Sequence, residues 1–378
     1  KQRRIMDNLK KIGLSALAGS LIAVSANAGE MSVSGSYGFT LSTQNGDTDG
    51  VADAVDVSGT NPNQGHGIGQ DKDFSVSGSG ELDNGWTFSG GTLLTDAMGL
   101  SSSSLSLTMG SLGTIMVGNT TGGNSTKYDV QTPAAYEEVD DGGATSISAN
   151  SVGSWMDGNS LVYASPTFDL MSGMSATVHV EYAPEASDAA TVDGGISAST
   201  TWDSGKSLGV TLAGNGLTIG VYGAERERTQ AGATADQTND IFAGVYYVNY
   251  AMGPVSIGYS KSYYDSGLDG VADGNTVAKA VGTAEGIFES ETYSVAFNVN
   301  DNLSVSYAKA EDTYDAQDDS SNGGTAIADV TSDYKSIQAA YSMGAMSIKA
   351  YRTEQDNVEY QTNGGSLTVN EIAVGLAF

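Results

Sequence analysis

The sequence predicts an all-β protein, namely a transmembrane antiparallel β-barrel of about 16 strands with short turns on one side and long loops on the other. Apolar side chains alternate with small or polar ones in segment after segment, which is typical of strands with one oily face. The alternation is unbroken over the last eleven residues, 368–378, where Ile372, Val374, Leu376 and the terminal Phe378 share one parity. Tight turns and long acidic connections alternate between the segments, as in barrels that cross a membrane.

The predicted strands follow one another from residue 31 to the end of the chain. They lie at 31–43, 73–82, 86–95, 102–110, 114–120, 159–165, 174–182, 195–214, 217–228, 240–252, 254–264, 289–300, 302–312, 334–343, 346–355 and 367–378. Asp203-Ser204-Gly205 leaves a second possibility open, in which a turn splits the eighth segment in two.

The connections test this assignment independently. Tight turns, each between an even strand and the next odd one, are predicted at 83–85, 111–113, 169–173, 215–216, 252–253, 300–302 and 344–345. Long polar stretches fill the other joints, at 44–72, 122–158, 184–194, 229–239, 265–288, 313–333 and 357–366, with a short exception at 96–101. Both ends of the barrel domain then lie on the same side, the periplasmic one.

The N-terminal residues have the pattern of a signal peptide. Lys10 and Lys11 precede an apolar stretch at 12–24, which is followed by the small residues Ala26-Asn27-Ala28. Cleavage is expected between Ala28 and Gly29, so that 1–28 are the signal peptide and 29–378 the barrel domain. Met6 as initiator would leave 1–5 as an upstream extension. The alternative is a buried core helix, because the apolar stretch is too short for a membrane anchor.

Composition and charge exclude several classes of protein. The chain has no Cys, 50 Gly and 5 Pro among 378 residues, which suits short strands and tight turns and rules out a disulfide framework or thiol chemistry. Removing 1–28 takes five bases and one acid from the 16 and 45 of the whole chain and leaves a net charge of −33. Such a protein repels nucleic acid and attracts cations.

Tyrosines near the predicted strand ends suggest a girdle at the membrane interface. A soluble β-sandwich core would show the same pattern one strand at a time and remains the alternative. The girdle residues, taken with the terminal aromatic, are Tyr246, Tyr247, Tyr250, Tyr259, Tyr263, Tyr307, Tyr341 and Phe378.

Short phrases at both ends, Met-Ser-Val-Ser-Gly-Ser-Tyr-Gly-Phe at 31–39 and Asn-Glu-Ile-Ala-Val-Gly-Leu-Ala-Phe at 370–378, resemble those of general porins of Gram-negative bacteria. The nearest style is that of the trimeric, sixteen-stranded porins of alphaproteobacteria. The resemblance implies an outer-membrane location, a homotrimer, and a terminal Phe378 that is a signal for the barrel insertion machinery. It also implies passive diffusion of small hydrophilic solutes and ions.

In that family the third external loop folds into the barrel and narrows it, and the stretch 122–158 occupies the corresponding place here. The resemblance makes Glu137, Glu138, Asp140 and Asp141 the acidic side of a constriction, where they would favour cations. The Pro-Glu-Phe-Gly-Gly motif of enterobacterial relatives is replaced by Pro-Ala-Ala-Tyr-Glu-Glu at 133–138. The alternative is an acidic loop that lies outside in solvent.

Few basic residues can face this loop from the barrel wall. Strand parity directs Arg226, Arg228 and Lys349 towards the lumen, and His179 likewise. On the opposite parity near the outer rim are Lys261, Lys309 and Lys335, which could anchor to lipopolysaccharide phosphates or extend to the interface. Anion preference is therefore not expected.

Two external loops carry a possible calcium motif. Asp47, Asp49, Asp53 and Asp56 surround a glycine in a pattern that resembles thrombospondin type 3 calcium loops, and Asp-Gly-Val-Ala-Asp recurs at 269–273. The second copy would use Asp265, Asp269 and Asp273. Acidic, solubilising loops with chance repetition explain the same residues equally well, and no cofactor is required.

The sequence holds no pattern of catalytic residues. There are two His, no Cys and no Gly-x-Ser-x-Gly segment, so an enzyme is not expected. Two alternatives to a channel stay open: a calcium-binding, β-rich surface protein or adhesin, and a barrel enzyme in which His179 has a Ser or Asp neighbour in the lumen.

Overall fold

The computed structural model of the chain is described here for part of its length. The described residues are 29–47, 64–95, 99–129, 131–141, 152, 156, 160–186, 202–229, 240–267, 286–315, 329–360 and 365–378. The signal peptide predicted at 1–28 lies outside them.

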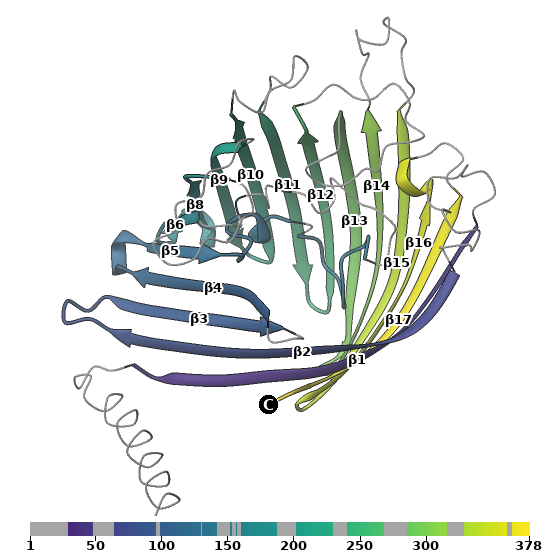
Figure 1. Ribbon diagram of the computed structural model, residues 1–378, viewed down its shortest axis with the longest axis horizontal. Coiled ribbons are helices and arrows are strands. Elements are labelled where there is room, and N and C mark those ends of the chain that lie inside the picture. Colours follow the sequence, from purple (N-terminus) through teal and green to yellow (C-terminus); the bar gives the residue numbers. More distant parts are fainter. Residues whose placement is uncertain are drawn as a thin grey trace, which may run out of the picture.

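The described strands form a single closed antiparallel sheet (Figure 1). β1 (Met31–Asp47) pairs with β2 (Gln64–Glu81) on one side and with β17 (Ser366–Ala377) on the other, which closes the ring. The other strands are β3 (Thr87–Thr95), β4 (Gly99–Thr108), β5 (Thr114–Asn119), β6 (Ser160–Ala164), β7 (Phe168–Asp169), β8 (Ser175–Ala183), β9 (Trp202–Gly214), β10 (Leu217–Arg228), β11 (Ile241–Met252), β12 (Val255–Asp265), β13 (Ile287–Asn300), β14 (Leu303–Asp315), β15 (Val330–Met343) and β16 (Met346–Asp356).

Short 3₁₀ turns complete the described elements: η1 (Gly110–Leu112), η2 (Ser125–Lys127), η4 (Met171–Gly173) and η6 (Val358–Tyr360). The predicted barrel is confirmed, and the β-sandwich alternative is wrong because the strands form one ring and not two facing sheets. No helix of the described residues is long and apolar enough to cross a membrane.

Seventeen strands fill 16 positions in the ring, because β6 and β7 both pair with β8. The interruption between them contains Pro166, which has no N–H to donate to a neighbouring strand. Ser165 bridges the gap, since its backbone N–H donates to Val178 O at 2.8 Å and its Oγ accepts from Val178 N at 2.9 Å. The sequence predicted this position as one strand ending at residue 165.

The predicted bounds of the first long loop were wrong. The first long loop, expected at 44–72, is shorter, because β1 and β2 continue to pair from Gln44 with Gly65 to Tyr37 with Lys72. Glycines at 65, 67 and 69 alternate there with larger residues, so the segment has strand periodicity despite its loop-like composition. The predicted continuity of β9 through 203–205 is confirmed, and the alternative, a turn that splits this strand, is wrong.

The short turns lie at one end of the barrel, as predicted, and the long connections at the other. Asn215 and Gly216 join β9 to β10 with φ of 53° and 80°, the positive values that a two-residue hairpin turn requires. Asn is one of the few residues besides Gly that adopts them readily.

The two faces of the wall differ in the way that the alternation predicts. Outward side chains of β10 to β16 include Val221, Tyr246 and Ile337, which are 55%, 44% and 62% exposed. Tyr247 is not part of this outward girdle, because neighbouring residues of a strand face opposite sides and Tyr246 already faces out. Tyr247 points inwards and is buried, over the space left by Gly220.

Phe378 lies at the seam that closes the barrel. Its backbone exchanges two hydrogen bonds of 2.9 Å with Gly35 of β1. A Cβ on Gly35 would lie 2.9 Å from the Phe378 ring, so the ring rests on the space that this glycine leaves.

Candidate pore constriction

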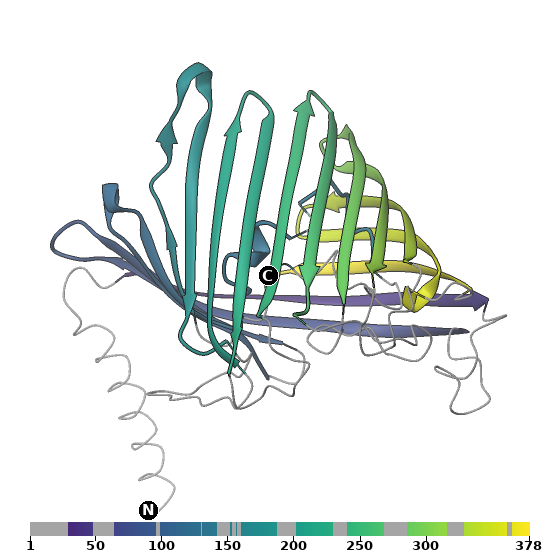
Figure 2. The same ribbon diagram turned by 90° about the horizontal axis from the view of Figure 1, so that it is seen from above.

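The described part of the connection between β5 and β6 lies inside the ring of strands and contacts the inner side of the wall (Figure 2). We call the described part of it, residues 120–129 and 131–141, the inner loop. After its first residue it contacts strands β8 to β12 and then β14 to β17, so it follows the wall from one side of the barrel to the other.

The root of the inner loop is fixed to a buried carboxylate. Glu181 of β8, 2% exposed, accepts hydrogen bonds from the backbone N–H of Asn124 at 2.9 Å and from Ser160 Oγ at 2.6 Å. Ser207 Oγ of β9 lies at 3.4 Å. A buried carboxylate with several donors is well satisfied, so this contact holds the start of the loop to three strands.

Tyr128 fits into the same part of the wall. Its hydroxyl lies 2.6 Å from His179 Nδ1 and 3.2 Å from Thr211 Oγ1, and its ring stacks on Tyr222 with centroids 4.9 Å apart. The ring occupies the space above Gly209, where any Cβ would overlap it. The loop therefore packs here like part of a protein core.

The middle of the inner loop docks in a similar way. Asn249 of β11 donates to the carbonyl of Gln131, and Pro133 lies over Gly258 of β12. Both contacts depend on small or amide side chains at inward positions of the wall, since a larger residue at 258 would displace the loop.

The acidic end of the loop docks on β14 to β17. Ala135 N donates to Ser306 Oγ at 2.9 Å, and the Tyr136 hydroxyl donates to Glu371 Oε1 at 3.0 Å. The side-chain amide of Gln338, on β15, holds the backbone between Tyr136 and Glu138. These contacts bring together residues that lie about 170–235 positions apart in the chain.

The four carboxylates that the sequence singled out follow this docked segment. Asp140 is buried, whereas Glu137, Glu138 and Asp141 are half-buried. Asp141 Oδ2 accepts from Glu138 N at 3.1 Å. Burial and the nearby Asp141 raise the pKa of Glu137 to about 7, and burial with Asp129 and Asp140 raises the pKa of Glu138 to about 8.

The predicted basic residues all lie on inward positions of the wall, but they differ in surroundings. Lys349 of β16 lies with Nζ 4.7 Å from the Tyr136 ring and attracts Glu137. Arg226 and Arg228 of β10 lie over Trp202, at 3.7 and 4.4 Å from its ring, and Arg226 is buried. Lys349 is therefore the predicted base that lies beside the acidic segment.

His179 also faces inwards, but Tyr128 covers it and leaves it 8% exposed. Its hydrogen-bond partner is the Tyr128 phenol and not a Ser or Asp. A barrel enzyme would need a Ser or Asp beside His179, so the Tyr128 contact gives no support to catalysis at this residue.

The inward side chains of β1 to β4 are small or polar for the most part, and serine is the commonest of them. The inner loop meets this wall at its first residue, where Thr120 Oγ1 donates to the Ser101 carbonyl of β4. Ser32 and Ser77, both exposed, share a hydrogen bond of 2.7 Å, as do Ser34 and Ser75. Asp73, which accepts from Ser36 at 3.3 Å, adds negative charge, as does Asp71 on the same face. No inward Lys or Arg lies on β1 to β4.

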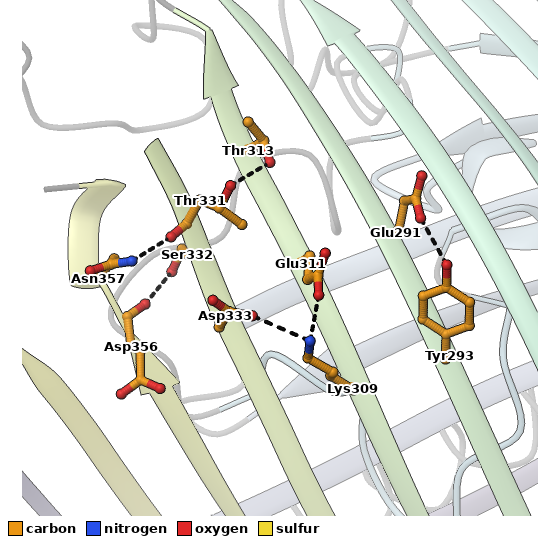
Figure 3. A network of polar contacts seen from close by, with 10 residues as sticks. All are labelled: Glu291, Tyr293, Lys309, Glu311, Thr313, Thr331, Ser332, Asp333, Asp356 and Asn357. Atoms are coloured by element: carbon orange, nitrogen blue, oxygen red, sulfur yellow. Dashed lines mark hydrogen bonds and ion pairs between the residues drawn. The ribbon is translucent and has the colours of Figure 1, made fainter. Parts of the chain in front are cut away.

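The three outward lysines take part in a belt of charges on β12 to β16. Lys261 pairs with Glu289 at 3.4 Å and Glu291 at 2.9 Å. Lys309 pairs with Glu311 and, at 3.5 Å, with Asp333, as Figure 3 shows. Lys335 stands in register with Lys309, on the same outward face.

The proposed calcium residues are only partly described. Asp49, Asp53, Asp56, Asp269 and Asp273 lie outside the described residues, and so does the side chain of Asp47. Asp265 ends β12 and accepts from Gly267 N at 2.8 Å. Within the described ranges, no group of three His, Asp or Glu side chains is arranged to hold a metal ion.

Several residues of the site gave no signal in the sequence. Tyr128 and Gln338 contact partners that lie about 50 to 200 residues away in the sequence. Lys127, an exposed base on η2, lies in a polar stretch without strand periodicity, so parity could not assign it to the lumen. A Gln at an inward strand position is a weak sign of a docking residue, because it is larger and more polar than its serine neighbours.

Comparison with known proteins supports the fold. No family model matches the chain, and no curated protein matches it by sequence. The fold is similar to that of Salmonella typhi OmpF in complex with daunomycin (TM-score 0.64, 13% identity, 94% of this chain and 99% of the other). It is similar to Vibrio cholerae OmpT (TM-score 0.58, 13% identity, 94% and 99%).

A mutant of the Rh. blastica porin also matches, with a TM-score of 0.54, 14% identity, and coverage of 92% of this chain and 100% of the other. At such low identities the likeness concerns the fold, which is that of the sixteen-stranded porins.

Proposed function

We propose that the protein forms a water-filled channel for passive diffusion of small hydrophilic solutes and ions. The observation that carries the proposal is a closed barrel with a polar inner face and a loop docked inside it. A barrel of 16 strands leaves an aqueous lumen, and we expect the inner loop to narrow this lumen. The fold similarity to porins supports the same function.

Cation preference is the second part of the proposal. Glu137, Glu138 and Asp141 lie on the inner loop, and Asp71 and Asp73 lie on the serine wall. Of the inward bases, Lys349 contacts Tyr136, and Arg226 is buried against Trp202. Carboxylates in a narrow passage lower the energy of a passing cation and raise that of an anion.

The cellular setting follows from the same reasoning. We propose export by a signal peptide at 1–28, insertion by the machinery that recognises a terminal Phe378, and residence in the Gram-negative outer membrane. A homotrimer would use the outward face of β2 to β5, where Gly78, Gly90 and Thr92 give a smoother surface than the tyrosine-rich face opposite. Lipopolysaccharide would contact the outer rim, where Lys335 is the lysine best placed to meet a phosphate.

Neither catalysis nor a required cofactor is part of the proposal. Calcium in the external loops stays a separate proposal, based on the sequence motif at 47–56 and its repeat at 269–273. Its role would be to neutralise and order acidic loops.

Single-channel recording from purified, refolded protein in a planar bilayer tests the proposal. Stepwise conductance is expected, and no conductance from folded protein would reject a channel. A salt gradient then gives the permeability ratio of potassium to chloride, which is expected to exceed one. A ratio below one would reject cation preference while leaving the channel intact.

A further inference from the structure

The side chain of Gln338, on the barrel wall, holds the acidic segment of the inner loop. It hydrogen-bonds to backbone N–H and C=O groups of this segment, as the backbone of a neighbouring strand would. Gln338 of β15 is 3% exposed. Its Oε1 accepts from the backbone N–H of Tyr136 at 2.9 Å and of Glu137 at 3.1 Å. Its Nε2 donates to the carbonyl of Glu137 at 2.7 Å, with the carbonyl of Glu138 at 3.5 Å.

An amide suits this position because it donates and accepts at the same time. The loop backbone has both N–H and C=O groups to satisfy, and a buried backbone group without a partner is costly. A carboxylate at 338 could accept but not donate, and an aliphatic side chain could do neither. The remaining contacts of Gln338, with Ser336 and Ser306, lie on the wall and keep the amide oriented.

We infer that Gln338 is the positioning residue of the constriction: it fixes where Glu137 and Glu138 lie, and thereby sets the ion selectivity of the channel. The inference rests on the proposed function. The backbone groups that Gln338 holds belong to Tyr136 and to these two glutamates, so the points from which both side chains extend stay fixed while the amide contacts persist.

Neighbouring contacts assist but hold fewer groups. Ser306 accepts from Ala135 N alone, and Glu371 accepts from the Tyr136 hydroxyl at 3.0 Å. Lys349 and Tyr351 pack on the Tyr136 ring, at 4.7 Å and with centroids 5.8 Å apart. Gln338 lies between these contacts and bonds to the backbone itself, so its loss should release the acidic segment more than the loss of any of them.

The first test measures loop position without using ion flow. The chain has no Cys, so Ala135→Cys with Ser306→Cys gives one pair, at a contact where Ala135 N lies 2.9 Å from Ser306 Oγ. The rate of disulfide formation in refolded protein is compared with and without Gln338→Leu. We expect at least a tenfold slower rate in the Gln338→Leu background. Equal rates would overturn the inference.

The second test measures selectivity. Gln338→Leu should lower the potassium-to-chloride permeability ratio at least twofold. It should also broaden the distribution of single-channel current amplitudes in the open state. The matched control is Gln355→Leu on β16, a similarly buried amide whose Nε2 donates at 2.9 Å to Ser332 Oγ and to the Tyr334 hydroxyl, both on the wall. The control should keep the wild-type ratio. Equal effects of the two variants would mean general loosening of the barrel and would overturn the inference.

Gln338→Glu serves if Gln338→Leu does not fold. It keeps the acceptor for Tyr136 N and Glu137 N, but it cannot donate to the Glu137 carbonyl. Its disulfide rate should fall below the rate measured with Gln338 in place, and an unchanged rate would overturn the inference. If wild-type protein shows no cation preference, the proposed selectivity fails, whereas the disulfide rates still decide whether Gln338 positions the loop.

Discussion

Strands β1 to β4 and strands β10 to β16 form two parts of the same barrel wall, yet their inward faces carry different chemistry. The first face has exposed serines such as Ser32 and Ser77, which bond to each other. The second face has buried aromatic and polar side chains, among them Tyr247 and Gln338, which contact the inner loop. One wall is lined for water, and the other is built to hold a loop.

The outward faces differ as well. β2 to β4 present Gly78, Gly90 and Ser103 among their aliphatic residues, whereas β11 to β14 present tyrosines and ion pairs such as Lys261 with Glu291. A smooth face suits contact with another protein surface, and aromatic rings with charges above them suit a lipid interface. The same alternation of inward and outward residues therefore serves four environments: the water-lined inner face, the inner face that holds the loop, the smooth outer face and the tyrosine-rich outer face.

Removing Phe378 should have the largest effect, because it shortens the seam at which β17 meets β1 and ends the outward apolar face of β17 early. Two backbone hydrogen bonds with Gly35 and the last outward aromatic ring would be lost. We expect a large loss of folded, heat-modifiable protein in the outer membrane, with synthesis and export unchanged. Phe378→Tyr is the matched control and should assemble. Normal assembly of the truncated chain would contradict the assignment.

An added arginine should separate the two walls. Ser290→Arg, on β13, would force a long charged side chain into a position that is 2% exposed, opposite the buried Asp312. Attraction between two buried charges often does not repay the cost of removing them from water, and the larger side chain has no room there. Ser77→Arg, on β2, would place the same charge on an exposed inward position. The first change should lower the thermal midpoint strongly.

Ser77→Arg should leave the midpoint near the wild-type value and should lower the potassium-to-chloride permeability ratio about twofold or more. Similar melting of both variants would remove the distinction between a covered and an open wall.

The acidic segment should make selectivity depend on pH. The raised pKa values of Glu137, about 7, and Glu138, about 8, mean that both carboxyls are largely neutral at pH 6 and largely ionised at pH 9. The cation permeability ratio should therefore rise between pH 6 and 9. Because these pKa values lie above the ordinary one, the stability that their protonated forms give the docked loop is complete below about pH 4.5 and is lost as pH rises through 7–8.

Glu137→Gln with Glu138→Gln should flatten this profile. The measurement is a series of reversal potentials at constant ionic strength, and a pH-independent ratio in wild type would contradict the pKa assignment.

Calcium should have the smallest effect, confined to the external loops. If the loop motif binds it, millimolar calcium should raise the thermal midpoint by a few degrees, growing with the logarithm of concentration. Asp49→Asn should abolish the rise and leave conductance unchanged, and magnesium should substitute poorly. Identical melting with chelator and with calcium would rule out the site, and an equal rise with any divalent ion would indicate diffuse screening.

The strand count, turn positions and wall parity could be predicted because each depends on local alternation. Even Arg226 and Lys349 were assigned to the correct face in this way. The extension of β2 to Gln64 was missed because three of the alternate residues there are glycines, which are typical of loops as well as of small inward positions.

The docking of the inner loop could not be derived from the residues themselves and came from family resemblance alone. Ala135 and Ser306 lie 171 positions apart in the chain, and Tyr136 and Glu371 lie 235 positions apart. A hydrogen bond between residues so far apart leaves no periodic trace in the sequence.

The central claim is that carboxylates of the inner loop, which docks on the wall formed by β10 to β16, set the cation preference of the channel. The wall formed by β1 to β4 lines the other side of this channel. The most direct measurement is the reversal potential of single channels in a potassium chloride gradient, for wild type and for Glu137→Gln, Glu138→Gln, Asp140→Asn and Asp141→Asn combined. The account predicts potassium preference in wild type and at least a twofold lower ratio in the variant, with folding retained. Chloride preference in wild type, or an unchanged ratio in the folded variant, would contradict it.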